Sequence, residues 1–273
     1  SRAMGAVALD VRWPFIGEFA GGTQRFTPRV AFIAAPRTRN FAIPNEDSRA
    51  VDLTWSNLFA INRFPGYDRF EDASRIVYGF DWSLALPGVA INTNVGQSYR
   101  LDRRSGLFPD GTGLTGRLSD IVGRTEVRYR DLISLVHRYR LDKENLAIRR
   151  NEVDATIGSR DTYALLGYLR LNRDIGGTLE DLQDREEVRA AGRVAINRYW
   201  SAFGSITIDL TDRAEDPLSL SDGFDPIRHR LGVAYEDDCL RLGVTWRRDY
   251  ERQGDVRSGN SFLLSLSFKN LGR

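Results

Sequence analysis

The feature that most constrains the fold of this chain is an alternation of apolar and polar side chains with a period of two residues. In residues 261–268, phenylalanine and leucine at even positions alternate with odd positions that are mostly serine. The same pattern recurs at 7–13, 25–32, 75–84 and 240–250, where one set is apolar and rich in aromatics and the other carries Arg, Asp, Asn, Ser and Gly. Successive side chains of a strand point to opposite faces of its sheet, so the pattern predicts strands with one apolar face and one polar face.

The length of these segments favours a membrane barrel over a soluble sheet. We count about 12–14 such segments of about 9–12 residues each, whereas strands of soluble proteins usually have about 5–6 residues. A tilted strand that crosses a bilayer needs about 9–11 residues. An open sheet edge in lipid would leave backbone groups unpaired, which favours closure. The sequence therefore predicts an all-β, antiparallel transmembrane β-barrel, with the apolar faces toward lipid and the polar faces toward a wet lumen.

The composition of the 273-residue chain excludes several other classes of protein. No run of about 20 apolar residues is present, which excludes a helical membrane protein. The aromatic content of 5 Trp, 10 Tyr and 14 Phe argues against a disordered chain. A formal net charge of +2 gives no basic field of the kind that binds nucleic acid. A single cysteine, Cys239, excludes an internal disulfide framework and a thiolate metal cluster.

The connections between the alternating segments are of unequal length. Turns are expected at 86–88, 130–131 and 237–238, and long polar loops at 37–50, 102–119 and 212–226. In outer-membrane barrels the turns are periplasmic and the longer loops are extracellular. Residues 51–72 are expected to form either a strand followed by a loop or a short helix folded over the lumen. No domain boundary is evident, so residues 1–273 are expected to form a single β-barrel region.

Three local patterns suggest other chemistry. Gly111–Gly116 matches the G-x-G-x-x-G fingerprint, but no buried strand precedes it and no helix is expected after it, so we interpret it as a glycine-rich loop. His137 and His229 are the only histidines, and neither has metal-binding spacing. Ser134 lies three residues from His137 and therefore on the opposite face of a strand, which argues against a nucleophile–base pair. We expect each histidine on a wet face or at the interface.

Charged side chains leave two further alternatives open. The acidic stretch 45–48, together with Asp68, Glu71 and Asp72, has the oxygen ligands that suit a divalent cation, although a solvated extracellular loop is the preferred interpretation. The luminal arginines either attract phosphate groups or pair with luminal Asp and Glu. We expect no metal, no cofactor and no catalytic site.

A more specific signal is the stretch Asn62–Arg75, of sequence NRFPGYDRFEDASR, followed by Tyr78-Gly79. It resembles the LPS-assembly protein family LptD, also called OstA. Further blocks in the same order as in that family are Arg12-Trp13-Pro14-Phe15, Ile43–Ser48, Leu58-Phe59, Gly96–Tyr99, Ser119–Gly123, Gly232–Cys239 and Leu266–Gly272. The motif residues singled out for a role are Asn62, Arg63, Gly66, Tyr67, Asp68, Arg69, Glu71 and Asp72.

The resemblance implies a chain that is part of a longer protein, because family members carry a signal peptide, a periplasmic jellyroll and a 26-strand barrel. The chain itself opens at Ser1-Arg2-Ala3-Met4 without a signal peptide, which leaves a cytoplasmic protein, a mature form or a fragment as expectations. The resemblance favours the last of these. It predicts that this chain is the C-terminal part of the barrel, in the outer membrane of a Gram-negative cell.

The resemblance also implies a mechanism. Lipopolysaccharide arrives over periplasmic bridge proteins that dock on the N-terminal domain. Its acyl chains leave through a lateral gate between the first and last barrel strands, while an LptE-type lipoprotein plugs the lumen. The gate strand in this chain comprises Ser261, Phe262, Leu263, Leu264, Ser265, Leu266, Ser267 and Phe268.

The resemblance gives Cys239 a role as well. Some members carry two adjacent cysteines near the C-terminus that are bridged to N-terminal cysteines, whereas here the pair is Asp238-Cys239. A disulfide from Cys239 to a residue outside this chain is therefore implied, and a free thiol at a periplasmic turn is the alternative.

Three other functions stay open on the sequence. The first is a stand-alone, porin-like channel of about 14 strands. The second is an outer-membrane hydrolase that depends on His137 or His229. The third is a soluble β-sandwich binding module, since antiparallel sheets of that class also alternate.

Overall fold

A computed structural model describes residues 4–37, 51–102, 107–172, 184–212, 223–250 and 258–269. Within these ranges the chain forms 14 strands and one short helix. The elements are β1 (Val7–Arg12), β2 (Phe15–Phe19), β3 (Gly22–Ala34), α1 (Trp55–Leu58), β4 (Arg75–Leu86), β5 (Val89–Arg100), β6 (Ile121–Tyr129), β7 (Ile133–Leu141), β8 (Ile148–Gly158), β9 (Tyr163–Leu171), β10 (Arg185–Ala195), β11 (Trp200–Asp209), β12 (Asp225–Glu236), β13 (Leu240–Asp249) and β14 (Gly259–Phe268).

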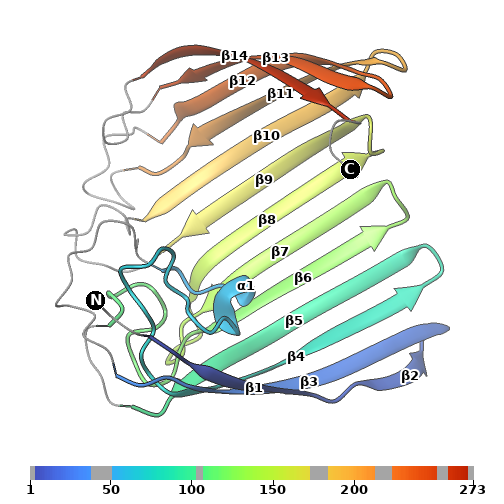
Figure 1. Ribbon diagram of the computed structural model, residues 1–273. Helices are drawn as coiled ribbons and strands as arrows, with labels where there is room; N and C mark the ends of the chain where they lie inside the picture. The colour runs from blue at the N-terminus through green and yellow to red at the C-terminus, as the bar shows by residue number, and fades with distance from the viewer. Residues whose placement is uncertain are drawn as a thin grey trace. The chain divides into compact units, whose positions relative to one another are not determined.

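The strands form one sheet whose order follows the sequence from β3 to β14, with β1 and β2 both paired to β3 (Figure 1). Strands that follow one another along the chain are neighbours, and short turns such as those after β4 and β12 join them. The predicted all-β antiparallel fold and the expected number of strands are confirmed. Among the described residues, no helix is long and apolar enough to cross a membrane.

The expected strand length is wrong at the N-terminal end, where β1 has 6 residues and β2 has 5. The two nevertheless pair with β3 in one continuous register, Arg12 opposite Arg29 and Phe15 opposite Phe26. Pro14 lies at the break, and it has no N–H to donate to the ladder. β1 and β2 are therefore one long strand that Pro14 interrupts.

The chain divides into two compact units. Unit 1 comprises Ser1–Val127, Val136–Glu152 and Arg170–Asp184, and unit 2 comprises Arg128–Leu135, Val153–Leu169 and Arg185–Arg273.

In unit 1 the hydrophobic core lies on the face of the sheet that carries the polar residues of the alternation. Ile33 of β3 is 2% exposed, whereas its neighbour Phe32, on the apolar face, is 48% exposed. Val77 of β4 is likewise fully buried. Residues 51–73, termed the inserted segment, and residues 107–120, termed the second loop, contribute the rest of this core. The buried apolar residues are Ala31, Ile33, Val51, Leu53, Leu58, Phe64, Val77, Leu107, Phe108, Leu114 and Val122.

The inserted segment contains α1, so of the two structures expected for 51–72 the short helix is correct. The backbone N–H of Thr54, the residue before the helix, donates to Asn57 Oδ1 at 2.9 Å. The helix packs against β5. A Cβ on Gly96 of β5 would lie 2.7 Å from Leu58 Cδ2 and 2.8 Å from the Tyr78 carbonyl oxygen. Glycine at this position therefore lets α1 approach the sheet.

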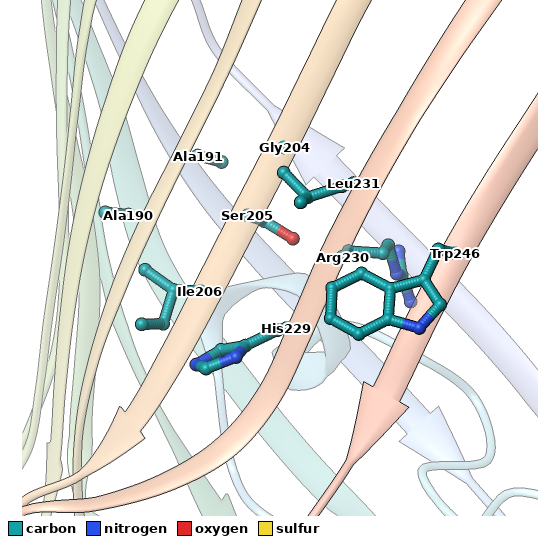
Figure 2. Close-up of a pocket in the computed structure, with 9 residues that line it drawn as sticks. All are labelled: Ala190, Ala191, Gly204, Ser205, Ile206, His229, Arg230, Leu231 and Trp246. Carbon is teal, nitrogen blue, oxygen red and sulfur yellow. The ribbon is translucent and has the colours of Figure 1, made fainter. Parts of the chain in front are cut away.

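In unit 2 the register of β10 to β14 separates an apolar face from a polar face. Leu231, Trp246 and Phe262 are aligned across β12, β13 and β14 on the apolar face. A hollow of about 390 Å³ opens on this face over β10 to β13 (Figure 2). All ten residues of β14 are exposed, and among the described residues only β13 pairs with it.

Replacing Gly96 by valine should displace α1 from the sheet, because the added Cβ would overlap both a leucine side chain and backbone. We expect a loss of roughly 1–3 kcal/mol of stability, the usual cost of overpacking, and faster proteolysis of the inserted segment in the detergent-solubilised protein. The matched control is Gly17→Val, since a Cβ on Gly17 of β2 meets no atom within 4 Å. Equal stability and equal proteolysis of the two variants would contradict this packing.

Candidate functional site on the polar face of unit 1

The inserted segment is held on the polar face by backbone and ring contacts with the second loop. The Leu53 N–H donates to the Thr112 carbonyl at 3.1 Å. The rings of Phe64 and Phe108 stack with centroids 4.7 Å apart. On the sheet side, the Arg29 guanidinium lies 3.7 Å from the centre of the Phe59 ring. The two connections therefore form one packed layer over the strands.

A buried ion triad fixes the inserted segment to β4. Glu71 Oε1 lies 3.2 Å from Arg63 Nη1 and 3.3 Å from Arg75 Nη1, and none of the three side chains is more than 1% exposed. Arg63 also donates to the Leu58 carbonyl at 2.9 Å, and Arg75 donates to the Ala60 carbonyl at 2.6 Å. Burial lowers the pKa of Arg63, and the Glu71 carboxylate opposes that shift. The Glu71 carboxylate reduces the buried charge of the two arginines to a net +1, and the carbonyls of Leu58 and Ala60 accept further hydrogen bonds from them.

Other residues of the motif determine the conformation of the loop that joins Arg63 to Glu71. Asn62 Oδ1 accepts hydrogen bonds from the N–H groups of Glu71 (3.0 Å) and Phe64 (3.3 Å), which closes the loop at its base. Gly66 has φ +77°, a left-handed conformation that favours glycine. Tyr67, at the tip, is 85% exposed. The motif therefore contains a buried structural base and an exposed tip.

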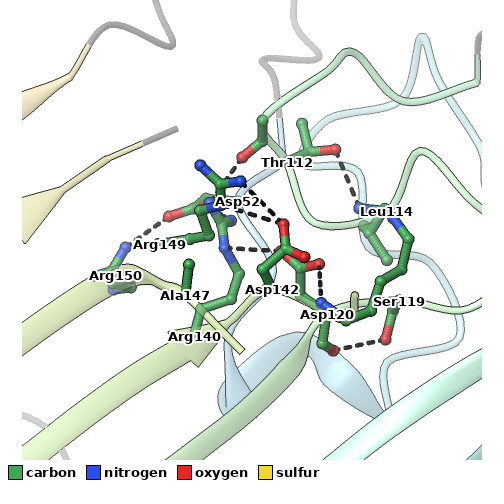
Figure 3. Close-up of polar contacts among 12 residues, drawn as sticks. Asp52, Thr112, Leu114, Ser119, Asp120, Arg140, Asp142, Ala147, Arg149 and Arg150 are labelled. Carbon is green, nitrogen blue, oxygen red and sulfur yellow. Dashed lines mark hydrogen bonds and ion pairs between the residues drawn. The ribbon is translucent and has the colours of Figure 1, made fainter. Parts of the chain in front are cut away.

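A second charged network joins the inserted segment to β7 and β8 (Figure 3). Asp52 forms ion pairs with Arg140 of β7 and with Arg150 of β8, the latter at 2.6 Å. Arg150 also pairs with Glu152 at 2.7 Å, and Arg140 Nε lies 3.4 Å from Asp120 Oδ2. The alternative in which luminal arginines pair with luminal carboxylates is confirmed for these residues.

For Asp120, a member of this network, burial affects the pKa more than the neighbouring charges do. Burial raises the pKa of the Asp120 carboxyl, and the Arg140 guanidinium opposes the shift without cancelling it. Arg140 is itself buried and donates to the Gly111 carbonyl at 2.7 Å. Gly111 and Gly113, both at φ +78°, are thus part of the second loop, and the interpretation of 111–116 as a glycine-rich loop is confirmed.

The sequence did not single out the second network. Asp52 and Arg140 are 88 positions apart, and no local spacing links them. The only available signal was general: arginines on the polar face of predicted strands, in a chain with nearly equal numbers of acidic and basic residues.

The expected solvated acidic loop is wrong for Glu71 and Asp72, which are 0% and 1% exposed. Residues 45–48 lie outside the described residues. Glu71 meets two arginines, and across the described part of the chain no group of three His, Cys, Asp or Glu residues could hold a metal ion. The structure therefore brings together Asn62, Arg63, Glu71 and Asp72 as a structural base.

Both histidines lie on the apolar face, so the wet face expected as one of two places is wrong, and the interfacial placement stays a prediction. Arg138 and Arg140 belong to the polar face of β7, so His137 lies on the apolar face, where Nε2 is 2.9 Å from Asn151 Oδ1. Ser134 and His137 are on opposite faces, as predicted. His229 also lies on an apolar face, opposite Ile206.

Cys239 and the predicted gate strand are close together at the C-terminal end. Cys239 is an exposed free thiol in the turn between β12 and β13. Its carbonyl accepts a hydrogen bond from the Lys269 N–H at 2.9 Å. The segment 261–268 falls within β14, whose side chains are exposed on both faces. Its role as a gate stays a prediction.

Replacing Glu71 by glutamine should destabilise the protein by about 3–5 kcal/mol, because Arg63 and Arg75 would remain buried without a counter-charge. Urea unfolding followed by heat-modifiable gel mobility measures this loss. The control is Asp10→Asn, which breaks ion pairs of Asp10 with Arg12 and Arg29 that are more exposed and should cost about 1 kcal/mol or less. A Glu71→Gln variant as stable as the control would refute the anchoring role of the triad.

Sequence comparisons match this chain to one family of proteins. The family described as LptD, LPS transport system D, matches residues 1–200. An LPS-assembly protein LptD of Saccharophagus degradans is 26% identical over 301 residues, covering 100% of this chain and 34% of that protein. One from Polaromonas sp. is 29% identical over 263 residues, covering 92% of this chain and 30% of that protein. The chain thus spans about a third of the length of the curated relatives it matches.

Among solved structures, a mutant of Rh. blastica porin aligns with a TM-score of 0.37 and 13% identity, covering 89% of this chain and 86% of that chain. The family match covers well over half of the residues and includes the inserted segment with its ion triad. It places the chain among transport proteins of the Gram-negative outer membrane, and not among enzymes. On the match over residues 1–200, the chain belongs to the LptD family.

Proposed function

We propose that this chain forms part of an outer-membrane translocon that inserts lipopolysaccharide into the outer leaflet. The observation that carries the proposal is the family match over residues 1–200. In this proposal the saccharide passes along the polar face of the sheet, and the acyl chains pass the edge strand β14. The curated relatives are named as LPS-assembly proteins, and this chain corresponds to about a third of their length.

The pairing and the side chains of β14 favour a lateral gate at this strand. Among the described residues, β14 pairs only with β13. Leu263 lies on the polar-face side of β14, opposite Thr245, and is 64% exposed. An apolar side chain on the polar side of an otherwise serine-rich row suits a strand that acyl chains pass. A first barrel strand in the remainder of the protein would complete the gate.

The proposal includes two kinds of partner. A plug lipoprotein of the LptE type would contact the interior side of the sheet, where the inserted segment and its exposed Tyr67 lie. Periplasmic bridge proteins would deliver lipopolysaccharide through an N-terminal domain of the longer protein. The alternative is a stand-alone, porin-like channel, which needs neither partner.

A photoreactive benzoylphenylalanine at Leu263 should form an adduct with lipopolysaccharide in growing cells, because transported acyl chains pass this strand. The matched control is the same replacement at Phe203 of β11, which lies in the same register row and on the same face as Leu263 but three strands away, on a strand paired on both sides. The adduct should depend on continuing lipopolysaccharide synthesis.

The alternatives give different results in this experiment. Ion conductance of the purified protein without any lipopolysaccharide adduct at Leu263 would favour the porin-like channel. An adduct of equal yield at both positions, persisting after synthesis is blocked, would show resident lipid and contradict passage along β14.

We further propose that Cys239 forms a disulfide with a cysteine outside this chain. The thiol is exposed in a short turn, the kind of connection that faces the oxidising periplasm in these barrels. Native outer membranes should then show a band that changes mobility on reduction, and Cys239→Ser should abolish the change. A band near the mass of this chain, unaffected by reduction, would contradict the bridge.

A further inference from the structure

The hollow in unit 2 lies on the apolar face of four successive strands. Ala190, Ile206 and His229 occupy one register row across β10, β11 and β12. In the next row on the same face, Gly204 faces Leu231, and Leu231 faces Trp246. These six side-chain positions are the part of the lining that belongs to the apolar face (Figure 2). The hollow therefore opens toward lipid.

Differences in side-chain size create the hollow. Its lining is smallest at Ala190, while Ile206, Leu231 and Trp246 carry larger side chains around it. Leu231 leans over Gly204, where a Cβ would lie 2.9 Å from Leu231 Cδ2. A volume of about 390 Å³ lies at the small end of ligand pockets, which span roughly 300–1,000 Å³. This space suits one acyl chain and not a complete lipid.

The hollow extends from the middle of the strands toward their loop ends. The turn that joins β12 to β13 is short, spanning residues 237–239. Ala190 is the middle residue of β10, whereas His229, the fifth of 12 residues in β12, and Trp246, the seventh of 10 in β13, lie between the middle of the strand and the opposite end. In outer-membrane barrels the short turns are periplasmic, so this opposite end belongs to the outer leaflet.

Polar groups lie at that end of the hollow. Arg248, exposed on the apolar face opposite His229, has its guanidinium 4.6 Å from the centre of the Tyr250 ring. The Tyr250 hydroxyl lies 3.1 Å from His229 Nδ1. His229 Nε2 is buried without a hydrogen-bond partner among the described residues. On the opposite face, Arg247 pairs with Asp249 at 2.5 Å, whereas no such pair of Arg248 is seen in the described part of the chain.

We propose that this hollow holds one acyl chain of a lipopolysaccharide molecule resident in the outer leaflet, with a phosphate of that lipid at Arg248. The apolar lining accepts the chain, and a guanidinium at the outer end has the geometry to bind a phosphate. The loop-side position selects lipopolysaccharide over a phospholipid of the inner leaflet. The inference rests on the outer-membrane location and is independent of transport along β14.

The test uses protein extracted from outer membranes in mild detergent, stripped of lipid and titrated with hexa-acylated lipid A in native mass spectrometry. Arg248→Gln should weaken lipid A binding about tenfold, as expected for one charge-assisted hydrogen bond. Ala190→Leu, which fills the hollow, should weaken it by a similar factor. Gel mobility before and after heating verifies that each variant is folded.

Two matched controls identify the site. Ala202→Leu adds the same bulk on the apolar face of β11, opposite Val233 and outside the hollow. Arg247→Gln removes the neighbouring charge on the polar face. Both should bind lipid A within about twofold of the parent protein. If Ala190→Leu does not fold, the exposed Arg248 carries the test.

Two outcomes would overturn the proposal. Equal loss of lipid A in the site variants and their controls, or no loss in any of them, would mean only non-specific annular lipid. Phosphatidylglycerol binding as tight as lipid A, and equally sensitive to Arg248→Gln, would assign the hollow to a phospholipid. Neither result bears on the lipopolysaccharide adduct expected at Leu263, so this inference and the transport proposal fail independently.

Discussion

The pairing of backbone N–H and C=O groups between neighbouring strands is the constraint on which this structure depends. In lipid no water is available to these groups, so each strand must lie beside another. The chain meets this requirement with a sheet in sequence order, in which even the break at Pro14 preserves the register of β1 and β2 on β3. The same constraint applies at both ends of the strand order, because within the described residues β1 pairs only with β3 and β14 only with β13. In lipid, an edge of this kind needs a further strand beside it.

Burial on the polar face is the second determinant of the structure. The inserted segment covers β3 to β6 with an apolar core, and its charges meet those of the strands in compensated groups. Glu71 links two buried arginines, and Asp52 links buried Arg140 to partly buried Arg150. Because an unpaired buried charge costs several kcal/mol, such groups hold the segment in one position. Tyr67, at the tip of this anchored segment, stays exposed.

The two proposals give the two faces of the sheet different relations to lipopolysaccharide. We propose that the polar face and the edge strand meet a molecule in transit, and that the hollow over β10 to β13 holds a molecule already in the membrane. Both proposals depend on the same period-two alternation, because it places Leu263 of β14 and Leu231 of β12 on opposite faces of the sheet. A lipid retained beside the last strands would also define the local environment into which a transported molecule emerges.

The sequence by itself determined the strands, their two faces, three of the short turns and the family, because alternation and the stretch 62–75 are local properties of the chain. It did not determine that the polar face of unit 1 is buried. Charged residues such as Arg63, Glu71 and Asp72 occur in solvated loops as well as in buried ion pairs, so their identity does not reveal their burial. The pairing of Asp52 with Arg140 and the hollow beside Trp246 were likewise decided by tertiary structure. The physical reason is that each depends on register and on contacts between distant residues, and a single sequence does not encode these as a local pattern.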